Sequence, residues 1–238
     1  MIKAWSMSRL DVFETCPYRA KLQYIDKIPQ KEREVPEGKD EHPLDRGIRV
    51  HDAAEKFVKE DILLIEELKL FENDFLAARE LYRTTPHNCI VEEDWAFDDA
   101  WQKTGWNSDD CWGRLKLDLG VIDDDYMDIV DYKTGKKYAP KHIQQGQLYA
   151  IVSFLRFPQL KNVNTKFWYV DSGDTLEQSY NRLQGLVLKD GFDNRARALT
   201  TATQFPAKSS AYACRFCPYG EGRDGNKHCE YRYSYTNL

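Results

Sequence analysis

The segment 112–136 constrains the fold more strongly than any other part of the chain, because it holds two strand patterns joined by an acidic turn. Over 112–122, leucine and valine alternate with charged or small residues, which is typical of a strand with one buried face. Residues 123–125 are all aspartate, and 126–132 return to a strand pattern. The sequence therefore predicts a β-hairpin in this segment.

Helix and strand patterns also occur on both sides of the hairpin. The segment 29–43 is charged and rich in proline, which predicts an exposed loop. Helices are expected over 8–24, 46–83, 141–157 and 178–203, and strands over 92–98 and 166–170. In the first helix Ser8 is the expected N-cap and Pro17 a break. The second helix should be interrupted near Asp61. Helices that flank a small central sheet predict an α/β fold.

Composition narrows the class of protein. The chain has 238 residues, about the length of one elaborated domain, and its 42% hydrophobic content excludes a disordered chain. The formal charge of 34 − 39 = −5 argues against a protein that coats nucleic acid by bulk charge, although divalent cations in a carboxylate site would reverse the charge locally. No apolar run is long enough for a bilayer, and the N-terminus lacks a signal-peptide core. We therefore expect a cytoplasmic protein without a membrane partner.

Asp131 and Lys133 are two residues apart on the second strand of the hairpin, so their side chains leave the same face. Asp118 lies on the polar side of the first strand. Two carboxylates that converge from paired strands suit Mg²⁺ or Mn²⁺. A lysine beside them could orient or deprotonate a water, or stabilise charge on a phosphate, which is the chemistry of phosphodiester hydrolysis. The alternative is an ordinary charged strand edge.

Four of the six cysteines have the spacing of metal ligands. Cys214 and Cys217 form a C-x-x-C pair, Cys229 follows after eleven residues, and Cys16 could join them from the N-terminal helix. Four thiolates suit a [4Fe–4S] cluster or tetrahedral Zn²⁺, and in a zinc site His228 could replace one cysteine. The alternative is a set of reduced, unligated thiols. Cys89 and Cys111 are expected to be structural.

Four blocks of sequence together resemble the PD-(D/E)xK nuclease superfamily, in its RecB-like branch with a C-terminal cysteine cluster. They are S-R-L-D-V-F-E-T-C-P-Y-R-A-K-L-Q-Y-I at 8–25, R-G-I-R-V-H-D-A-A-E at 46–55, the hairpin ending in D-Y-K-T-G-K, and H-I-Q-Q-G-Q-L-Y-A at 142–150. This branch includes CRISPR-associated iron–sulfur exonucleases and phage exonucleases. The resemblance implies a restriction-endonuclease-like core, with a small mixed sheet flanked by helices.

The resemblance also implies roles for individual residues. The implied metal ligands are His51, Asp118, Asp131 and the backbone carbonyl of Tyr132. Lys133 would be the catalytic lysine. Gln145 and Tyr149 match the family's Q-x-x-x-Y motif and share a helix face at i, i+4, although Gln144 and Gln147 leave the register of this motif open.

The first aspartate departs from the family pattern. Many relatives place it three residues after a glycine, where this chain has Lys116, and Asp118 comes five residues after Gly113. Both positions lie on the same strand face, so Asp118 can reach the site one pleat further along. The alternative is that Glu92, Glu93 or Asp128 supplies part of the metal site.

For the cysteines, the resemblance favours a [4Fe–4S] cluster over structural Zn²⁺. The cluster would be a clasp that ties together the two ends of the chain, so that its binding free energy becomes folding free energy. We therefore expect a single RecB-like nuclease domain over 1–238, with the clasp formed by 1–28 and 205–238 and the nuclease core by 46–203.

These observations predict a divalent-metal-dependent DNA exonuclease, active on single-stranded DNA or duplex ends in recombination, repair or phage DNA processing, with 5′→3′ polarity favoured by the resemblance. Lys136, Lys137 and Lys141 follow the catalytic strand and could bind the phosphate backbone. One rival is a non-catalytic nucleic-acid-binding subunit that works with a helicase or recombination partner in a larger complex. Another is a zinc-clasped interaction module without a nucleic-acid role.

Overall fold

The computed structural model describes residues 1–30, 34–215, 217–219 and 228–231. The chain divides into two compact units, one formed by Met1–Glu34 with Asp193–Leu238 and the other by Val35–Phe192. The larger unit contains the sheet, and the smaller unit contains the four cysteines with metal-ligand spacing.

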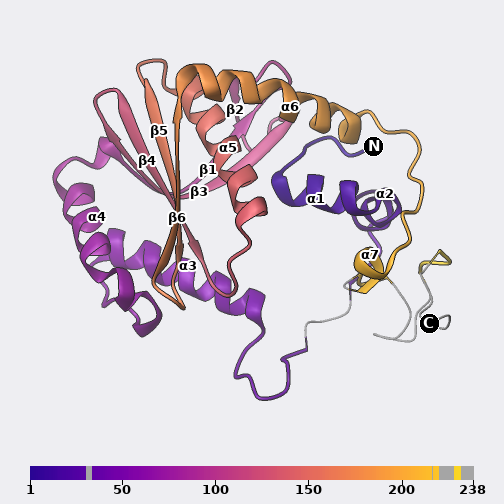
Figure 1. The fold of residues 1–238 in the computed structure, drawn as a ribbon, viewed down its shortest axis with the longest axis horizontal. Helices are drawn as coiled ribbons and strands as arrows, with labels where there is room; N and C mark the ends of the chain where they lie inside the picture. The colour runs from indigo at the N-terminus through magenta and orange to yellow at the C-terminus, as the bar shows by residue number, and fades with distance from the viewer. Residues whose placement is uncertain (31–33, 216, 220–227, 232–238) are drawn as a thin grey trace. The chain divides into compact units, whose positions relative to one another are not determined.

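The larger unit is built on a mixed six-stranded sheet (Figure 1). The strands lie in the order β2-β1-β3-β4-β5-β6, and only β4 and β5 are parallel. Their bounds are β1 Cys89–Phe97, β2 Lys103–Thr104, β3 Gly113–Asp123, β4 Tyr126–Lys133, β5 Asn162–Tyr169 and β6 Asp174–Asn181. The predicted α/β class and small mixed sheet are confirmed.

The predicted hairpin is the β3–β4 pair at the centre of this sheet. The ladder runs from Asp123↔Tyr126 to Leu119↔Val130. Two residues connect the strands, and Asp124 adopts a left-handed conformation at φ 47°, which aspartate tolerates better than most residues. Short acidic turns of this kind let the strands pair without a long loop.

Helices cover the two faces of the sheet (Figure 1). On one face lie α3 (Pro43–Glu60) and α4 (Glu72–Thr84), which share one core with β1, β3, β4 and β5. Two 3₁₀ segments, Glu66–Phe71 and Pro86–Asn88, flank α4. The predicted interruption near Asp61 is confirmed, because α3 ends at Glu60 and Asp61 is left-handed at φ 61°.

On the opposite face, α5 (Ala139–Arg156) connects the parallel strands β4 and β5. Gly146 allows this helix to approach the sheet closely. A Cβ at this position would lie 2.6 Å from Thr165 Oγ1 and 3.3 Å from Phe167 Cε2, distances too short for a side chain. The glycine therefore fixes how deeply α5 sits on β5.

The predicted helix over 178–203 is wrong in its first part, because α6 begins at Arg182 and continues to Thr200. The residues before it form β6, which was not predicted. This strand lies at the edge of the sheet with most of its side chains exposed, so it lacks the apolar alternation that identifies a strand in a sequence. The short β2 was also missed, and β1 and β5 begin earlier than expected, at Cys89 and Asn162.

The smaller unit contains α1 (Met7–Thr15), α2 (Pro17–Ala20), a π-helical turn (Lys21–Ile25) and α7 (Ala211–Arg215). The predicted break at Pro17 is confirmed. The N-cap is Ser6 and not Ser8, since the side chain of Ser6 accepts the hydrogen bond from Arg9 N. Within this unit Arg195 binds the carboxylate of Glu14 through two nitrogens, at 2.6 and 2.9 Å.

Candidate functional site

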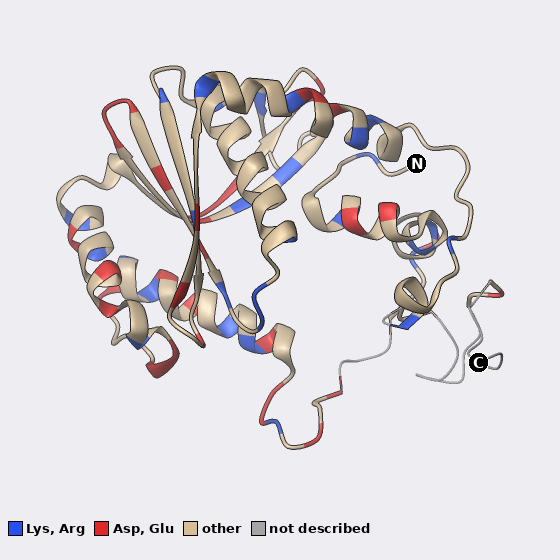
Figure 2. Ribbon diagram, in the orientation of Figure 1, with Lys and Arg blue, Asp and Glu red and all other residues tan. Residues whose placement is uncertain are grey.

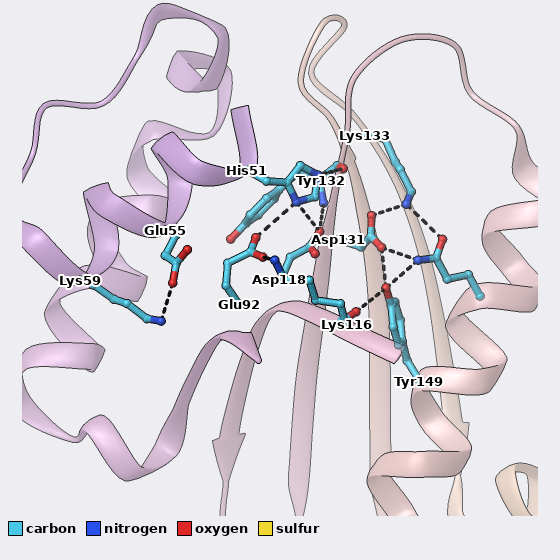
Figure 3. Close-up of polar contacts among 11 residues, drawn as sticks. His51, Glu55, Lys59, Glu92, Lys116, Asp118, Asp131, Tyr132, Lys133 and Tyr149 are labelled. Carbon is cyan, nitrogen blue, oxygen red and sulfur yellow. Dashed lines mark hydrogen bonds and ion pairs between the residues drawn. The ribbon is translucent and has the colours of Figure 1, made fainter. Parts of the chain in front are cut away.

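The candidate site lies where β3 and β4 stop pairing. The ladder ends at Leu119↔Val130, and beyond it the side chain of Asp118 replaces a backbone partner: Asp118 Oδ2 accepts a hydrogen bond from Tyr132 N at 3.0 Å. The separation of the strands leaves room for polar side chains from β1, α3 and α5 (Figure 3). The first aspartate of the predicted pair is therefore buried at the site, whereas Lys116, in the family's usual slot, has an exposed side chain.

Three side chains from three different elements form the first half of the site. His51 Nδ1 lies 3.3 Å from Glu92 Oε1 and 3.4 Å from Asp118 Oδ2. One ligand atom from each of His51, Glu92 and Asp118 falls within 4.8 Å of the others. An imidazole with two carboxylates is a donor set that fits Mg²⁺ or Mn²⁺. Glu92, which the sequence offered only as an alternative, belongs to this group.

Glu92 reaches the site through an unusual backbone conformation. It lies inside β1 with φ 48°, and the β1–β3 ladder pairs its neighbours Val91 and Glu93 but not Glu92 itself. A left-handed residue with a long side chain costs on the order of 1–3 kcal/mol, and such strain persists where the surrounding structure enforces it. The side chain is only 2% exposed, so the distorted strand aims a buried carboxylate at His51.

The tautomer of His51 follows from its second contact. His51 Nε2 lies 3.0 Å from the backbone carbonyl of Tyr132, and because a carbonyl can only accept, Nε2 carries a proton. This leaves Nδ1 as the nitrogen that faces the two carboxylates. A backbone carbonyl that orients a histidine in this way is a common support for a metal-binding imidazole.

The charges of this half of the site depend on one another. Burial alone would lower the pKa of His51, but Asp118 and Glu92 outweigh it and raise that pKa to about 10. Burial, followed by the charge of Asp131, raises the pKa of Asp118 to about 6, against the opposing effect of His51. Without a cation, a protonated His51 therefore balances the carboxylates together with Lys116, whose Nζ lies 2.7 Å from Glu92 Oε2.

The second half of the site is a hydrogen-bonded network around Asp131. Lys133 Nζ lies 2.5 Å from Asp131 Oδ1, which confirms that the two side chains share a face. Gln145 Nε2 and the hydroxyl of Tyr149 each lie 2.7 Å from Asp131 Oδ2. Burial raises the pKa of Tyr149 well above its usual value, so the phenol keeps its proton and acts as a donor.

Gln145 also connects Asp131 to the lysine, since its Oε1 accepts from Lys133 Nζ at 3.1 Å. Gln145 and Tyr149 are in direct contact at 2.6 Å, as expected for i, i+4 neighbours on α5. The structure thus brings together both residues of the proposed Q-x-x-x-Y motif. The side chain of Gln144, one alternative register, is exposed.

The two other alternative carboxylates are engaged elsewhere. Glu93 accepts a hydrogen bond from Trp95 Nε1 at 2.8 Å, and Asp128 pairs with Lys166 at 2.9 Å. Neither belongs to the group formed by His51, Glu92 and Asp118.

The site is open on one side. The side chains of His51 and Lys133 are 28% and 22% exposed, whereas those of Asp118 and Asp131 are 6% and 4% exposed. Of these four groups, the imidazole and the ammonium are therefore the accessible ones, and the carboxylates are buried.

A clamp that the sequence analysis missed holds the loop after Lys133. The carboxylate of Asp171 binds the guanidinium of Arg46 at 2.5 and 3.0 Å and also accepts from Gly135 N at 2.8 Å. The hydrogen bond from Arg46, opposed by burial, lowers the pKa of Asp171. Asp171 thus connects α3, the loop after β4 and the turn after β5. No pattern along the sequence links these positions, which are far apart in the chain.

All three predicted DNA-binding residues, Lys136, Lys137 and Lys141, are exposed on this loop and on the first turn of α5. In Figure 2 the ribbon is blue, the colour of Lys and Arg, where the chain passes into α5. Their position beside Lys133 follows directly from the sequence.

In the smaller unit, Cys16, Cys214, Cys217 and Cys229 all line one small pocket, and none of the four forms a disulfide. Burial raises the pKa of Cys217 and of Cys229, which disfavours the thiolate unless a metal compensates. Cys89 and Cys111 are buried in the other unit.

A family model described as the PD-(D/E)XK nuclease superfamily matches residues 4–221. This chain belongs to that superfamily. Nucleases of this superfamily generally use Mg²⁺ or Mn²⁺, and their substrate is DNA. The donor set formed by His51, Glu92 and Asp118 fits such an ion.

Two solved structures are similar to this nuclease. That of SSO0001 has 10% sequence identity and a TM-score of 0.43, with 98% of this chain and 88% of that chain covered. A candidate exonuclease from Eubacterium rectale has 11% identity and a TM-score of 0.47, with 87% and 85% covered. No curated protein matches the nuclease. None of the helices in the described part of the chain is long and apolar enough to cross a membrane.

Proposed function

We propose that this nuclease is a divalent-metal-dependent DNA exonuclease that acts on single-stranded DNA or on free duplex ends. The observation that carries the proposal is the division of the site into two halves. One half, His51–Glu92–Asp118, is suited to a metal ion, and the other presents Lys133 beside Asp131.

The ion would be held by His51 Nδ1, Glu92 and Asp118, with Asp131 and the carbonyl of Tyr132 adjacent. When bound, a divalent cation supplies Lewis acidity that stabilises negative charge on a phosphodiester. Taking the place of the proton on His51, it would also leave the imidazole neutral, the form that binds metals.

Lys133 and its partners, in the other half of the site, would act on the scissile phosphate. The ammonium is held by Asp131 Oδ1 and Gln145 Oε1, which position it to stabilise developing negative charge or to orient an attacking water. Gln145 and Tyr149 fix the carboxylate of Asp131 through its second oxygen. The network therefore restricts where Lys133 Nζ can lie.

The loop after Lys133 supplies the contact with the DNA backbone. Lys136, Lys137 and Lys141 would bind phosphates next to the one that is cleaved, which overcomes the net negative charge of the chain locally. Contacts of this kind carry no sequence preference.

We infer that the four cysteines of the smaller unit would hold a [4Fe–4S] cluster, as the resemblance to the RecB-like branch implies. In a tetrahedral zinc site, Zn–S bonds of about 2.3 Å bring the sulfurs within roughly 4 Å of one another. The choice of a cluster over such a zinc site rests on the resemblance to the RecB-like branch.

The experiment compares end-labelled linear and covalently closed circular single-stranded DNA with Mg²⁺, Mn²⁺ or chelator. Lys133→Ala is the test variant, and Lys56→Ala, an exposed lysine on α3, is the matched control. The proposal expects metal-dependent digestion of linear DNA by the wild type and the control but not by Lys133→Ala. Labels at the 5′ or 3′ end report the polarity, for which we expect 5′→3′.

Two outcomes would overturn the proposal. Digestion of closed circles would make the protein an endonuclease. Absence of digestion by protein that retains its cluster would favour a DNA-binding subunit of a helicase–nuclease complex. We further propose a role in recombination, repair or phage DNA processing, where DNA ends are substrates.

A further inference from the structure

The first half of α3 carries two apolar side chains without cover. Leu44 is 59% exposed and Ile48 is 65% exposed. By contrast, the buried residues of α3, Val50, Ala54, Phe57 and Val58, all come later in the helix. Burying one such aliphatic side chain is worth about 1.5–3 kcal/mol, so a ligand that covered these two neighbouring side chains would gain binding free energy.

These two residues lie in line with the metal site. Leu44, Ile48 and His51 are spaced i, i+4 and i+7 on the same helix, so their side chains project from one face. With a rise of about 1.5 Å per residue, Ile48 lies about 4–5 Å and Leu44 about 10 Å along the axis from His51. This is the length of one to three nucleotides of a DNA strand at about 3.4 Å each.

The same face meets the basic loop after Lys133. A Cβ built on Gly47 lies 3.5 Å from Thr134 Oγ1, so the first turns of α3 contact this loop. The loop also carries the exposed Lys136 and Lys137. The helix that carries the exposed apolar side chains thus contacts the loop that carries the exposed lysines. This combination matches a strand of nucleic acid, whose bases are apolar on their faces and whose phosphates are anionic.

We propose that Leu44 and Ile48 contact the unpaired bases of the DNA strand next to the nucleotide being removed. This inference rests on the proposed function and deepens it, because it names the part of the substrate that is recognised. Aliphatic side chains can pack against base faces or wedge between base steps, which are accessible in single strands and at frayed ends but are covered in an intact duplex. The two residues therefore favour unpaired ends over a closed duplex.

The test is a double-mutant cycle in which one change is made in the protein and the other in the DNA. Equilibrium binding is measured in the Lys133→Ala background with Mg²⁺, with and without the double substitution Leu44→Ser and Ile48→Ser. Each protein is tested with a single-stranded oligonucleotide and with one that lacks the bases of its terminal nucleotides. Leu63→Ser is the matched control, because Leu63 is 89% exposed but follows the far end of α3.

We expect the effect of base removal on binding to disappear when Leu44 and Ile48 are replaced. Removing the bases should weaken binding about tenfold for the protein with Leu44 and Ile48 but leave binding by the double variant unchanged. The salt dependence of binding should stay the same in the double variant, because no cation is removed. Leu63→Ser should behave as the unsubstituted protein does.

Equal effects of base removal on both proteins would overturn the inference. So would a concentration-dependent self-association that the double variant abolishes, since the surface would then belong to a second copy of the chain. If the wild type cleaves DNA but the cycle shows no coupling, only this inference fails. If the wild type neither binds nor cleaves DNA, the proposed function fails with it.

Discussion

The carboxylate of Asp118 accepts a hydrogen bond from the backbone N–H of Tyr132 across the gap between β3 and β4, at 3.0 Å. This bond satisfies a donor that the strand ladder no longer pairs, and it fixes a buried carboxylate beside His51. The place where the sheet opens is therefore also the place where the acidic site forms.

Glu92→Gln should weaken Mn²⁺ binding at least about tenfold, because it removes one anionic donor from the group with His51 and Asp118. Isothermal titration calorimetry on metal-free protein measures the affinity. Glu93→Gln is the control, since Glu93 bonds to Trp95 and not to the site. Equal affinity for both variants would exclude Glu92 as a ligand.

Metal binding should release about one proton near pH 7.5. His51 has a pKa of about 10 in the metal-free protein and must lose its proton to bind metal, so affinity should rise about tenfold per pH unit through neutral pH. Calorimetry in buffers of different ionisation enthalpy counts the protons. His87→Gln, a change at an exposed histidine, should leave the count unchanged, and a pH-independent affinity would contradict the prediction.

Below about pH 6 the rise of affinity with pH should become steeper. Asp118, whose pKa is raised to about 6 by burial and by Asp131, then binds a proton as well. Asp118→Asn should remove this second step, and because Asp118 helps to raise the pKa of His51, it should also reduce the number of protons released at neutral pH. A single slope across pH 5–8 in the wild type would contradict the assignment.

Asp171→Asn should lower kcat/KM for DNA about tenfold with little change in stability. The substitution weakens the clamp from Arg46 to the loop after Lys133, whereas an exposed ion pair contributes only about 0–1 kcal/mol to folding. Asp61→Asn, which loses ion pairs to Arg79 and Arg83 at the other end of α3, is the matched control. Equal kinetic losses in the two variants would argue against a positioning role for Asp171.

Gly146→Ala should destabilise the fold by about 1–3 kcal/mol and reduce activity, because the new Cβ meets Thr165 at 2.6 Å and moves α5 with its Gln145 and Tyr149. Gly191→Ala in α6 is the control, a glycine-to-alanine change in a helix without a steric clash. Its Cβ meets nothing within 4 Å, so it should be neutral or stabilise the fold by about 0.5–1 kcal/mol. Chemical denaturation and nuclease assays on both variants test this pair, and a stable, active Gly146→Ala would show that α5 is free to shift.

Much of the fold and part of the site could be predicted from neighbouring residues. The hairpin, the shared face of Asp131 and Lys133, and the pairing of Gln145 with Tyr149 all depend on a period of two or 3.6 within one element. Such patterns are local, and the structure bears them out. The edge strand β6 was not predicted, because most of its side chains are exposed and it therefore lacks the alternation of apolar and polar residues.

The sequence by itself determined most of the helices and central strands and which of their side chains share a face, because backbone geometry repeats over a few residues. Only the tertiary structure decided that Glu92 joins His51 and Asp118, since this requires a left-handed residue inside β1 and the packing of α3 on the sheet. The same holds for the clamp from Asp171 to Arg46 and Gly135. These contacts join residues far apart in the chain, and their geometry is set by how whole elements pack and not by any local repeat.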